Sequence, residues 1–287
     1  GALSKDFAKG RENAVQALAL IGDPRAAVES LPLLGHPGRE VRFAAAEVIV
    51  SVPAAESAAR TLELLKERGV KSIGPAAYIL GRLKHAPARS ELEALLADRG
   101  APEREILARA LGWIGDAQSV ELLIQVLGEP DGEGRYGAVW SLGIMAPETG
   151  LEPLRRATRS SDARLALMAV EALGSYRSPA VLDDLERAVA SGGDARFAAI
   201  DAIALIPGDR ARQLLESYTR AGQVELRLSA IRALGSRKAA AAIPALMQVV
   251  RDGDTQEARQ AMLSLYAITG ERYANRSQWL HWYTTRE

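Results

Sequence analysis

Residues 104–127 read REILARALGWIGDAQSVELLIQVL, and the spacing of their apolar side chains decides the fold. Two leucines four positions apart, Leu107 and Leu111, precede Gly115, and a second such pair follows it. Residues four positions apart lie on one face of an α-helix, and glycine suits the turn that ends a helix. The stretch therefore predicts two short amphipathic helices joined by a tight turn.

The same pattern recurs along the chain with a period of about 31 residues. Steps of 31 residues, with one step of 30, lead from Gly22 to equivalent turn positions, which are Pro53, Lys84, Gly115, Ala146, Arg177, Pro207, Lys238 and Thr269. Four residues before these positions stand only leucine or isoleucine, in the order Leu18, Ile49, Leu80, Leu111, Leu142, Leu173, Ile203, Leu234 and Leu265. Eight residues before them stands alanine in every unit but one, which has Leu107. Columns filled in this way indicate a structural repeat.

The repeat predicts an all-α fold, an α-solenoid of about nine helix–turn–helix units of roughly 31 residues each. One pair of helices cannot bury its own apolar stripe, so each unit is stabilised by stacking on its neighbours. No linker, low-complexity tract or change of composition divides the array. We therefore expect a single repeat domain over residues 1–287.

These units resemble the short bacterial HEAT-like repeats, the type also found in phycobilin lyase subunits. The resemblance is clearest in the segments Ala110–Asp116, Ala233–Gly235 and Ile21–Pro24, and it extends over essentially the whole chain. It implies the architecture but says little about activity, because the repeat consensus consists of packing residues.

The two ends of the chain depart from the repeat. Leu3 stands where the last apolar residue of a preceding second helix would lie. Residues 1–8 are therefore expected to be the remnant of such a helix or an N-terminal cap, and we hypothesise that the parent protein extends upstream. Residues 270–287 contain Trp279 and Trp282 and resemble the aromatic C-terminal cap of many bacterial HEAT-like proteins. A terminal unit must cover an exposed apolar stripe, which favours a cap; the alternative is an aromatic ligand site.

Composition argues against several classes of function. Lysine plus arginine and aspartate plus glutamate both number 36, so the formal net charge is zero. Nucleic-acid binders usually carry a basic excess, so a nucleic acid is disfavoured as the partner. The chain has no cysteine, no apolar run as long as a membrane span and no cofactor-binding motif. We expect a monomer whose partner is a protein or peptide.

An aromatic patch is the first candidate binding site. Tyr136 and Trp140 lie four positions apart on one first helix, and Trp113 and Tyr78 belong to the two preceding units. Exposed aromatic side chains often mark protein interfaces, so the binding interpretation is that these four form one surface. The structural interpretation is that Trp113 is half-buried between helices.

Arginines supply the second candidate site. A row of them follows the apolar stripe of the second helices, namely Arg155, Arg156, Arg159, Arg187 and Arg220. In HEAT-like stacks the second helices line the concave surface, and by that resemblance the row would be a basic groove for an acidic partner. The structural alternative is that arginine near a helix C-terminus is favoured by the helix dipole.

A further arginine column repeats with the period near the start of the first helices. It consists of Arg11, Arg42, Arg104, Arg135, Arg196 and Arg227. A ladder of cations that grips an acidic partner is one interpretation. Because a residue that repeats with the period usually serves the stack, we expect these side chains to bind carbonyls or carboxylates of neighbouring units.

No catalytic or metal-binding constellation stands out in the sequence. The three histidines, His36, His85 and His281, form no His-Glu motif like those of the di-iron hydroxylase built from HEAT-like repeats. The leading hypothesis is therefore a non-enzymatic scaffold that binds a protein or peptide on the solenoid surface. The alternative is an enzyme on the same fold, an alkylbase DNA glycosylase or a chromophore lyase. The nearest candidates for a glycosylase site are Trp140, Arg155, Arg156 and Arg159.

Overall fold

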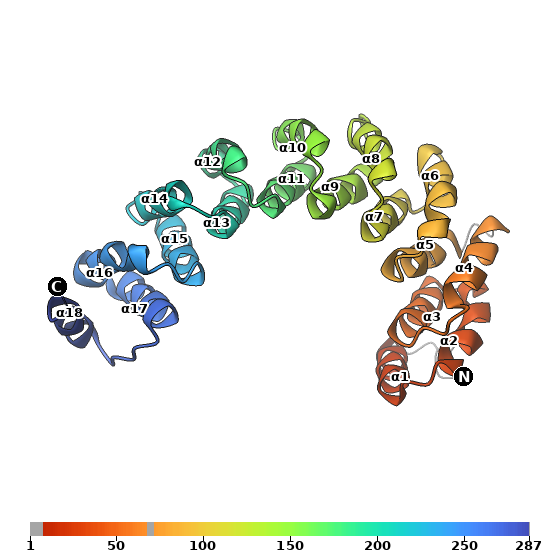
Figure 1. The fold of residues 1–287 in the computed structure, drawn as a ribbon, viewed down its shortest axis with the longest axis horizontal. Coiled ribbons are helices and arrows are strands. Elements are labelled where there is room, and N and C mark those ends of the chain that lie inside the picture. Colours follow the sequence, from red (N-terminus) through yellow and green to blue (C-terminus); the bar gives the residue numbers. More distant parts are fainter. Residues whose placement is uncertain (1–7, 68–71, 287) are drawn as a thin grey trace. The chain divides into compact units, whose positions relative to one another are not determined.

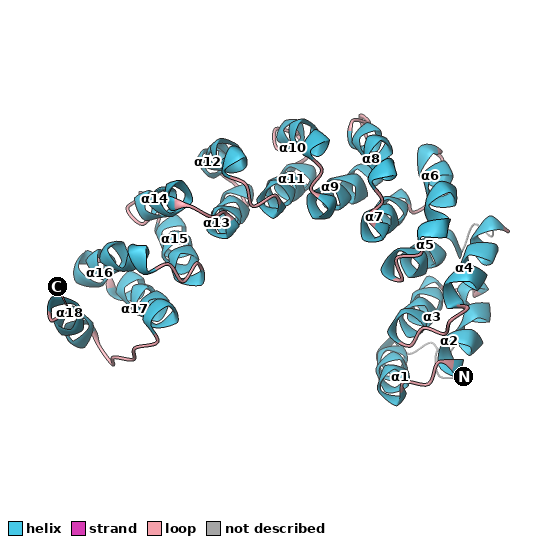
Figure 2. Ribbon diagram, in the orientation of Figure 1, coloured by secondary structure: helices cyan, strands magenta, loops and turns pink. Residues whose placement is uncertain are grey.

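The computed structural model describes residues 8–67 and 72–286. Within these ranges the regular secondary structure is helical throughout, with 18 α-helices and short 3₁₀ turns (Figures 1 and 2). The prediction of an all-α fold of paired helices is confirmed. The predicted N-terminal remnant lies, apart from Ala8, outside the described residues. No helix in the described part of the chain is long and apolar enough to cross a membrane.

The chain divides into two compact units, residues 1–153 and 154–287, and each is described by itself. In unit 1 the first helices of the repeats are α1 (Ala8–Ile21), α3 (Arg39–Ser51), α5 (Ile73–Arg82), α7 (Arg104–Ile114) and α9 (Gly134–Met145). The second helices are α2 (Arg25–Ser30), α4 (Ser57–Lys66), α6 (Arg89–Ala97), α8 (Val120–Leu127) and α10 (Leu151–Ala157), the last of which contains the boundary. The single repeat domain over residues 1–287 stays a prediction.

Unit 2 continues the alternation of first and second helices. Its first helices are α11 (Ala163–Ser175), α13 (Ala195–Leu205), α15 (Val224–Ser236) and α17 (Thr255–Thr269). Its second helices are α12 (Leu182–Ser191), α14 (Asp209–Tyr218), α16 (Ile243–Asp252) and α18 (Arg276–Thr284).

Within each unit the helices form two layers. First helices pack on the next first helix, as α7 does on α9 and α15 on α17, and second helices pack on the first helix that follows, as α8 does on α9 and α16 on α17. In either unit taken alone, the first helices lie along the inner side of the curve and the second helices along the outer side (Figure 1). The expectation that the second helices line a concave surface is therefore wrong within each unit.

The two repeated apolar columns form the core between these layers. From Ile49 to Leu265, every member of the leucine and isoleucine column is fully buried. The alanine column is equally buried from Ala45 to Ala261, and so is its exception, Leu107. Burial of these side chains, which share one face of each first helix, is the main force that holds successive repeats together.

A seam of glycines brings successive first helices into close contact in unit 1. A Cβ atom added to Gly81 of α5 would lie 2.7 Å from the Cα of Ala110 in α7. One added to Gly112 of α7 would lie 2.3 Å from the Oγ of Ser141 in α9. Both distances are far shorter than a normal van der Waals contact, so only glycine fits at these positions.

Serine hydroxyls form hydrogen bonds between successive first helices at the positions where the helices are closest. The Oγ of Ser141 donates a hydrogen bond of 2.8 Å to the carbonyl of Ala108. In unit 2 the Oγ of Ser264 in α17 donates one of 2.9 Å to the carbonyl of Ile231 in α15. Ser264 also packs against Gly235, where an added Cβ would lie 2.6 Å from the serine side chain. Each buried hydroxyl therefore has the partner that burial requires.

The arginine column near the start of the first helices binds within the stack. Arg104 donates two hydrogen bonds to the carbonyl of Leu96, of 3.1 and 2.8 Å, and two to the carboxylate of Glu129, of 2.6 and 2.7 Å. In unit 2, Arg227 donates to two carbonyls of the preceding turn and, at 2.6 Å, to the carboxylate of Glu257. The structural interpretation of the column is confirmed for these two members.

The bond between Arg104 and Glu129 predicts a pH dependence of stability. Hydrogen bonds from Arg104 hold the pKa of Glu129 below its usual value, because they favour the ionised carboxylate. This contribution is complete above the pKa of an unfolded glutamate, about 4.3, and is lost as the pH falls through the lower pKa of the folded state. We expect Glu129→Gln to unfold at a lower urea concentration than wild type at pH 7, and the difference to shrink toward pH 3. A difference that stays constant with pH would contradict this assignment.

Six of the nine turn positions that share the period adopt the left-handed backbone conformation. Gly22 and Gly115 have φ angles of 69° and 76°. Four members of the same column that are not glycine have φ angles between 44° and 52°, namely Lys84, Ala146, Arg177 and Lys238. An L-amino acid in this region costs about 1–2 kcal/mol, so the geometry is imposed by the packing of the two helices that the turn connects.

Helix α18 closes the second-helix layer at the end of unit 2. It packs mainly on α16, and its Trp279 and Trp282 are buried with their rings edge to face, 5.3 Å apart. No comparable helix covers α17 in the described part of the first-helix layer, and its Leu263 and Tyr266 are 55% and 38% exposed. Part of the α17 surface is therefore open to solvent.

Candidate functional site

Three aromatic rings form a continuous row across the first-helix layer of unit 1. Tyr78 of α5 and Trp113 of α7 meet edge to face with ring centroids 5.6 Å apart. Trp113 and Trp140 of α9 meet in the same manner at 5.2 Å. Such geometry is favourable for aromatic pairs, since the positive ring edge approaches the negative face. We call Tyr78, Trp113 and Trp140 the aromatic row.

The glycine seam makes room for the row. A Cβ atom on Gly81 would lie 2.9 Å from the ring of Trp113, so the indole occupies space that a side chain would otherwise fill. All three rings of the row are half-buried, which fixes their positions and leaves part of each accessible. Tyr136, one helical turn before Trp140 on α9, is also half-buried. Trp113 is thus packed between helices with part of its ring exposed, and the interpretation of these residues as a binding surface stays a prediction.

Charged side chains frame the row at the Tyr78 end. The Tyr78 hydroxyl donates a hydrogen bond of 2.7 Å to the carboxylate of Glu47 and accepts one of 2.9 Å from Arg82. Burial and the bond to Glu47 raise the pKa of Tyr78 to about 12, so the phenol is neutral at physiological pH. The guanidinium of Arg82 lies 5.5 Å from the ring centroid of Tyr78 and 5.8 Å from that of Trp113.

A second arginine frames the other end of the row. The guanidinium of Arg109 lies 5.2 Å from the ring centroid of Trp140 and pairs with Glu105 at 2.9 Å. The row is thus accompanied by two arginines and two glutamates, whose charges offset one another. Rigid rings bordered by both signs of charge suit the recognition of a peptide, since apolar contact and hydrogen bonds are offered side by side.

Two of the predicted basic residues form ion pairs with one buried carboxylate. Arg155 donates to Asp184 at 2.7 Å and to the carbonyl of Ala180 at 2.9 Å, and Arg187 donates to the other oxygen of Asp184 at 2.9 Å. Asp184 is only 3% exposed, so it requires these partners. Arg155 therefore joins α10 to α12, while Arg187 pairs with Asp184 within α12, so neither presents an unpaired cation.

The other members of the predicted basic row are exposed but separate. Arg156 is on α10, Arg159 follows that helix and Arg220 follows α14. Arg220 lines a small pocket of about 160 Å³ whose lining also includes the carboxylates of Asp252 and Glu257. The five arginines do not form the uniform basic groove that the sequence suggested.

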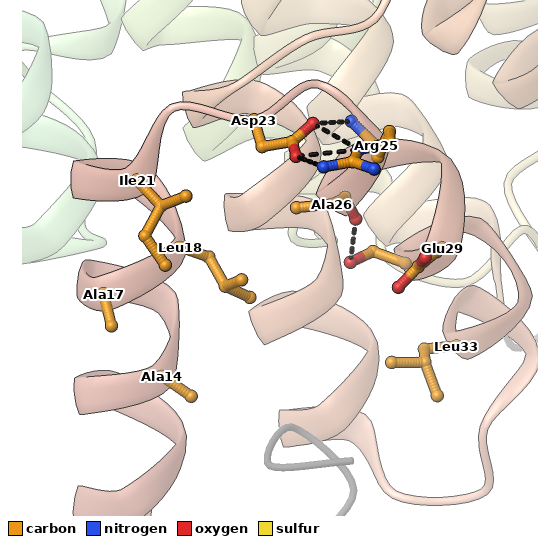
Figure 3. Close-up of a pocket in the computed structure, with 10 residues that line it drawn as sticks. Ala14, Ala17, Leu18, Ile21, Asp23, Arg25, Ala26, Glu29 and Leu33 are labelled. Atoms are coloured by element: carbon orange, nitrogen blue, oxygen red, sulfur yellow. Dashed lines mark hydrogen bonds and ion pairs between the residues drawn. The ribbon is translucent and has the colours of Figure 1, made fainter.

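A pocket of about 660 Å³ lies between α1 and α2 (Figure 3). Leu18 and Ile21 of α1 line one side, and Leu33 lines the other. At its edge Arg25 pairs with Asp23, and Glu29 adds a second carboxylate to the lining. The pocket exists because α1 and α2 both pack on α3 and leave space between themselves.

Another pocket, of about 560 Å³, lies at the C-terminal end of unit 2 beside α17. Sequence reasoning missed it. One signal was present: Tyr266 falls three residues before its turn position, where Gly81, Gly112, Gly174 and Gly235 stand in other repeats. The other repeats have Gly, Ala or Val at this position, so an aromatic ring here marks a place where close packing of first helices ends. In the described part of the chain, no cluster of three or more His, Asp or Glu side chains could hold a metal ion.

Stacked helix pairs with repeating cores define this chain as an all-α repeat protein, and family comparisons agree. A sequence profile of HEAT repeats matches residues 120–204 and 192–266, which together span about half of the chain. The PBS lyase HEAT-like repeat matches residues 103–129. The chain belongs to the HEAT-repeat family.

Among solved structures compared with this chain, one with a TM-score of 0.60 shows a similar fold at low sequence identity. It is the YibA protein of Escherichia coli, which is 14% identical over 93% of this chain and 100% of that one. The complex of CpcE and CpcF of phycocyanin lyase from Nostoc is 22% identical over 79% and 94%, with a TM-score of 0.48. Human deoxyhypusine hydroxylase is 18% identical over 91% and 98%, with a TM-score of 0.38. A search among curated proteins finds no match.

Proposed function

We propose that this chain is a non-enzymatic scaffold that binds a peptide segment of another protein on the aromatic row. The observation that carries the proposal is the unbroken contact of Tyr78, Trp113 and Trp140 across three successive first helices. The leucine and alanine columns fill the interior, whereas all three rings of the row keep part of their surface accessible.

The row is suited to binding because its side chains are already held in place. Aromatic rings lose little conformational freedom on binding, and these rings are fixed further by their edge-to-face contacts. Arg82 and Arg109 lie over the rings and offer donors to the carbonyls or carboxylates of a peptide. Tyrosine, tryptophan and arginine are also the residues that dominate measured interface energies.

Selection of random dodecapeptides on the immobilised full chain tests the proposal. We expect selected peptides to bind Trp140→Ala at least roughly 10-fold more weakly, since a buried aromatic contact contributes about 2 kcal/mol or more. Tyr218→Ala is the matched control, because it removes a half-buried ring from α14 in unit 2. Circular dichroism confirms that both variants are folded. Peptides that bind Trp140→Ala as tightly as wild type would contradict the proposal.

The alternative is an enzyme on the same fold, and one observation favours a chromophore lyase. The PBS lyase HEAT-like repeat matches residues 103–129, which include Trp113. A bilin mixed with the chain should then show an absorbance shift that is lost in Trp113→Ala, and an unchanged spectrum would count against this alternative. The case for a DNA glycosylase is weaker, because Arg155, one of the candidate residues for its site, is bound to Asp184.

A further inference from the structure

The outer face of α17 is arranged differently from the equivalent face of α15. In α15, Ile231 and Gly235 contact the next first helix, α17. Ser264 of α17 donates a hydrogen bond to the carbonyl of Ile231 and packs on Gly235. One period later the same positions hold Met262 and Tyr266. A tyrosine side chain in place of glycine keeps another first helix from approaching as closely as α17 approaches α15.

The face of α17 lines a pocket instead of a helix contact. Met262, Leu263 and Tyr266 form one wall, and Tyr273 and Trp279 form the other. The rings of Tyr273 and Trp279 meet edge to face, 5.0 Å apart. A volume of about 560 Å³ holds one large side chain together with its adjoining backbone.

The connection that forms the second wall is fixed by hydrogen bonds. The side chain of Asn275 accepts a hydrogen bond of 3.0 Å from the amide of Gln278, which caps α18. The amide of Ala274 donates one of 2.8 Å to the side chain of Gln278. The pocket is therefore formed before any ligand arrives, so binding incurs little ordering entropy.

The charges at the edge of the pocket are not balanced. Arg272 donates a hydrogen bond of 2.8 Å to the Tyr266 hydroxyl, and its guanidinium lies 4.7 Å from that ring's centroid. Among the described residues, neither Arg272 nor Arg259 has a carboxylate partner. The carboxylate at the edge, Glu271, pairs at 3.1 Å with Arg286. Two cations thus border an apolar cavity, and the one carboxylate among the described residues of its lining, Glu271, is paired with a third arginine.

The geometry points to a second peptide site, in which this pocket takes a bulky apolar or aromatic side chain that stands next to an acidic one. The apolar group fills the space between Tyr266 and Trp279, and the neighbouring carboxylate of the peptide meets Arg259 and Arg272. Charge complementarity selects this occupant over a neutral peptide, and Tyr266 disfavours a further HEAT-like helix or a second copy of the chain packed as one. The site is in unit 2 and does not depend on the aromatic row.

Selection of random heptapeptides by phage display on the full chain provides the test. Enriched peptides are expected to carry Phe, Trp or Leu beside Asp or Glu. Their synthetic forms should bind Leu263→Glu and the Arg259→Glu/Arg272→Glu double variant at least about 10-fold more weakly than wild type. Leu205→Glu on α13 is the matched control, because Leu205 and Leu263 are nearly equally exposed, at 54% and 55%.

The outcomes separate this inference from the function proposed for the aromatic row. Binding that is weakened by changes in the pocket but retained in Leu205→Glu and Trp140→Ala supports the second site. Four results overturn it: no enrichment of acidic–apolar peptides, equal binding by wild type and Leu263→Glu, equal loss in Leu205→Glu, or loss only in Trp140→Ala. The last of these would leave the aromatic row as the binding site.

Discussion

Replacement of Arg104 by alanine is expected to lower the free energy of unfolding by about 3 kcal/mol, because the change breaks a largely buried ion pair. Arg104 is only 6% exposed and holds the carbonyl of Leu96 as well as the carboxylate of Glu129. Its removal leaves that carbonyl without this donor and leaves Glu129 with the more distant Arg99, at 4.0 Å. Urea denaturation followed by circular dichroism at pH 7 measures the loss.

Amide hydrogen exchange locates the helices that are destabilised in Arg104→Ala. Solenoids open in parts, so the amides of α7 and α9 should exchange faster in Arg104→Ala while those of α15 and α17 change less. Arg156→Ala is the control, because Arg156 is exposed and should shift stability by less than about 0.5 kcal/mol. A loss below about 1 kcal/mol for Arg104→Ala would show that the ion pair contributes little to the stack.

Gly112→Ala is expected to destabilise the chain by about 2 kcal/mol. The added methyl group would lie 2.3 Å from the Oγ of Ser141 and 2.9 Å from its Cα, so α7 and α9 must separate. Because the contact is this short, overpacking should cost about 3 kcal/mol, and the gain of about 1 kcal/mol that alanine brings to a helix interior leaves a net loss of about 2 kcal/mol. Separation of the helices also lengthens the bond from Ser141 to Ala108.

Thermal or urea unfolding of Gly112→Ala beside Gly222→Ala checks this expectation. Gly222 has open space around the position of its missing Cβ, so its substitution should leave stability nearly unchanged. The double variant Gly112→Ala/Ser141→Gly should recover part of the loss, because it moves the small residue to the other helix. An unchanged or higher stability of Gly112→Ala would show that the seam is looser than the structure indicates.

The fold could be predicted from the sequence because its core repeats in the same side chains. Every member of the leucine and isoleucine column from Ile49 onward is buried, as the period required. The turn column was harder to interpret, since Lys84, Ala146 and Arg177 have no side-chain property in common. What they share is a positive φ angle. A positive φ angle cannot be recognised in the sequence when residues other than glycine adopt it.

The candidate sites were predictable only in part, because contacts between repeats join residues one period apart. Arg155 and Asp184 are separated by 29 positions and Tyr78 and Glu47 by 31, so opposite charges or donor–acceptor pairs at that offset could have been sought in the sequence. Trp113 belongs to a different column from Tyr78 and Trp140, and its place between them depends on Gly81. That relation requires three-dimensional geometry.

Tyr266 has a consequence for how such a chain can gain or lose repeats in evolution. Duplication of an internal segment, such as the one that carries Gly112 and Ser141, supplies both halves of the seam again and yields a longer array whose new junction fits. Duplication of the repeat that carries Tyr266 would instead place a tyrosine ring where Gly81, Gly112 and Gly235 stand in closely packed repeats. Changes in copy number are therefore expected to be better tolerated among the repeats that carry glycine than at the repeat that carries Tyr266.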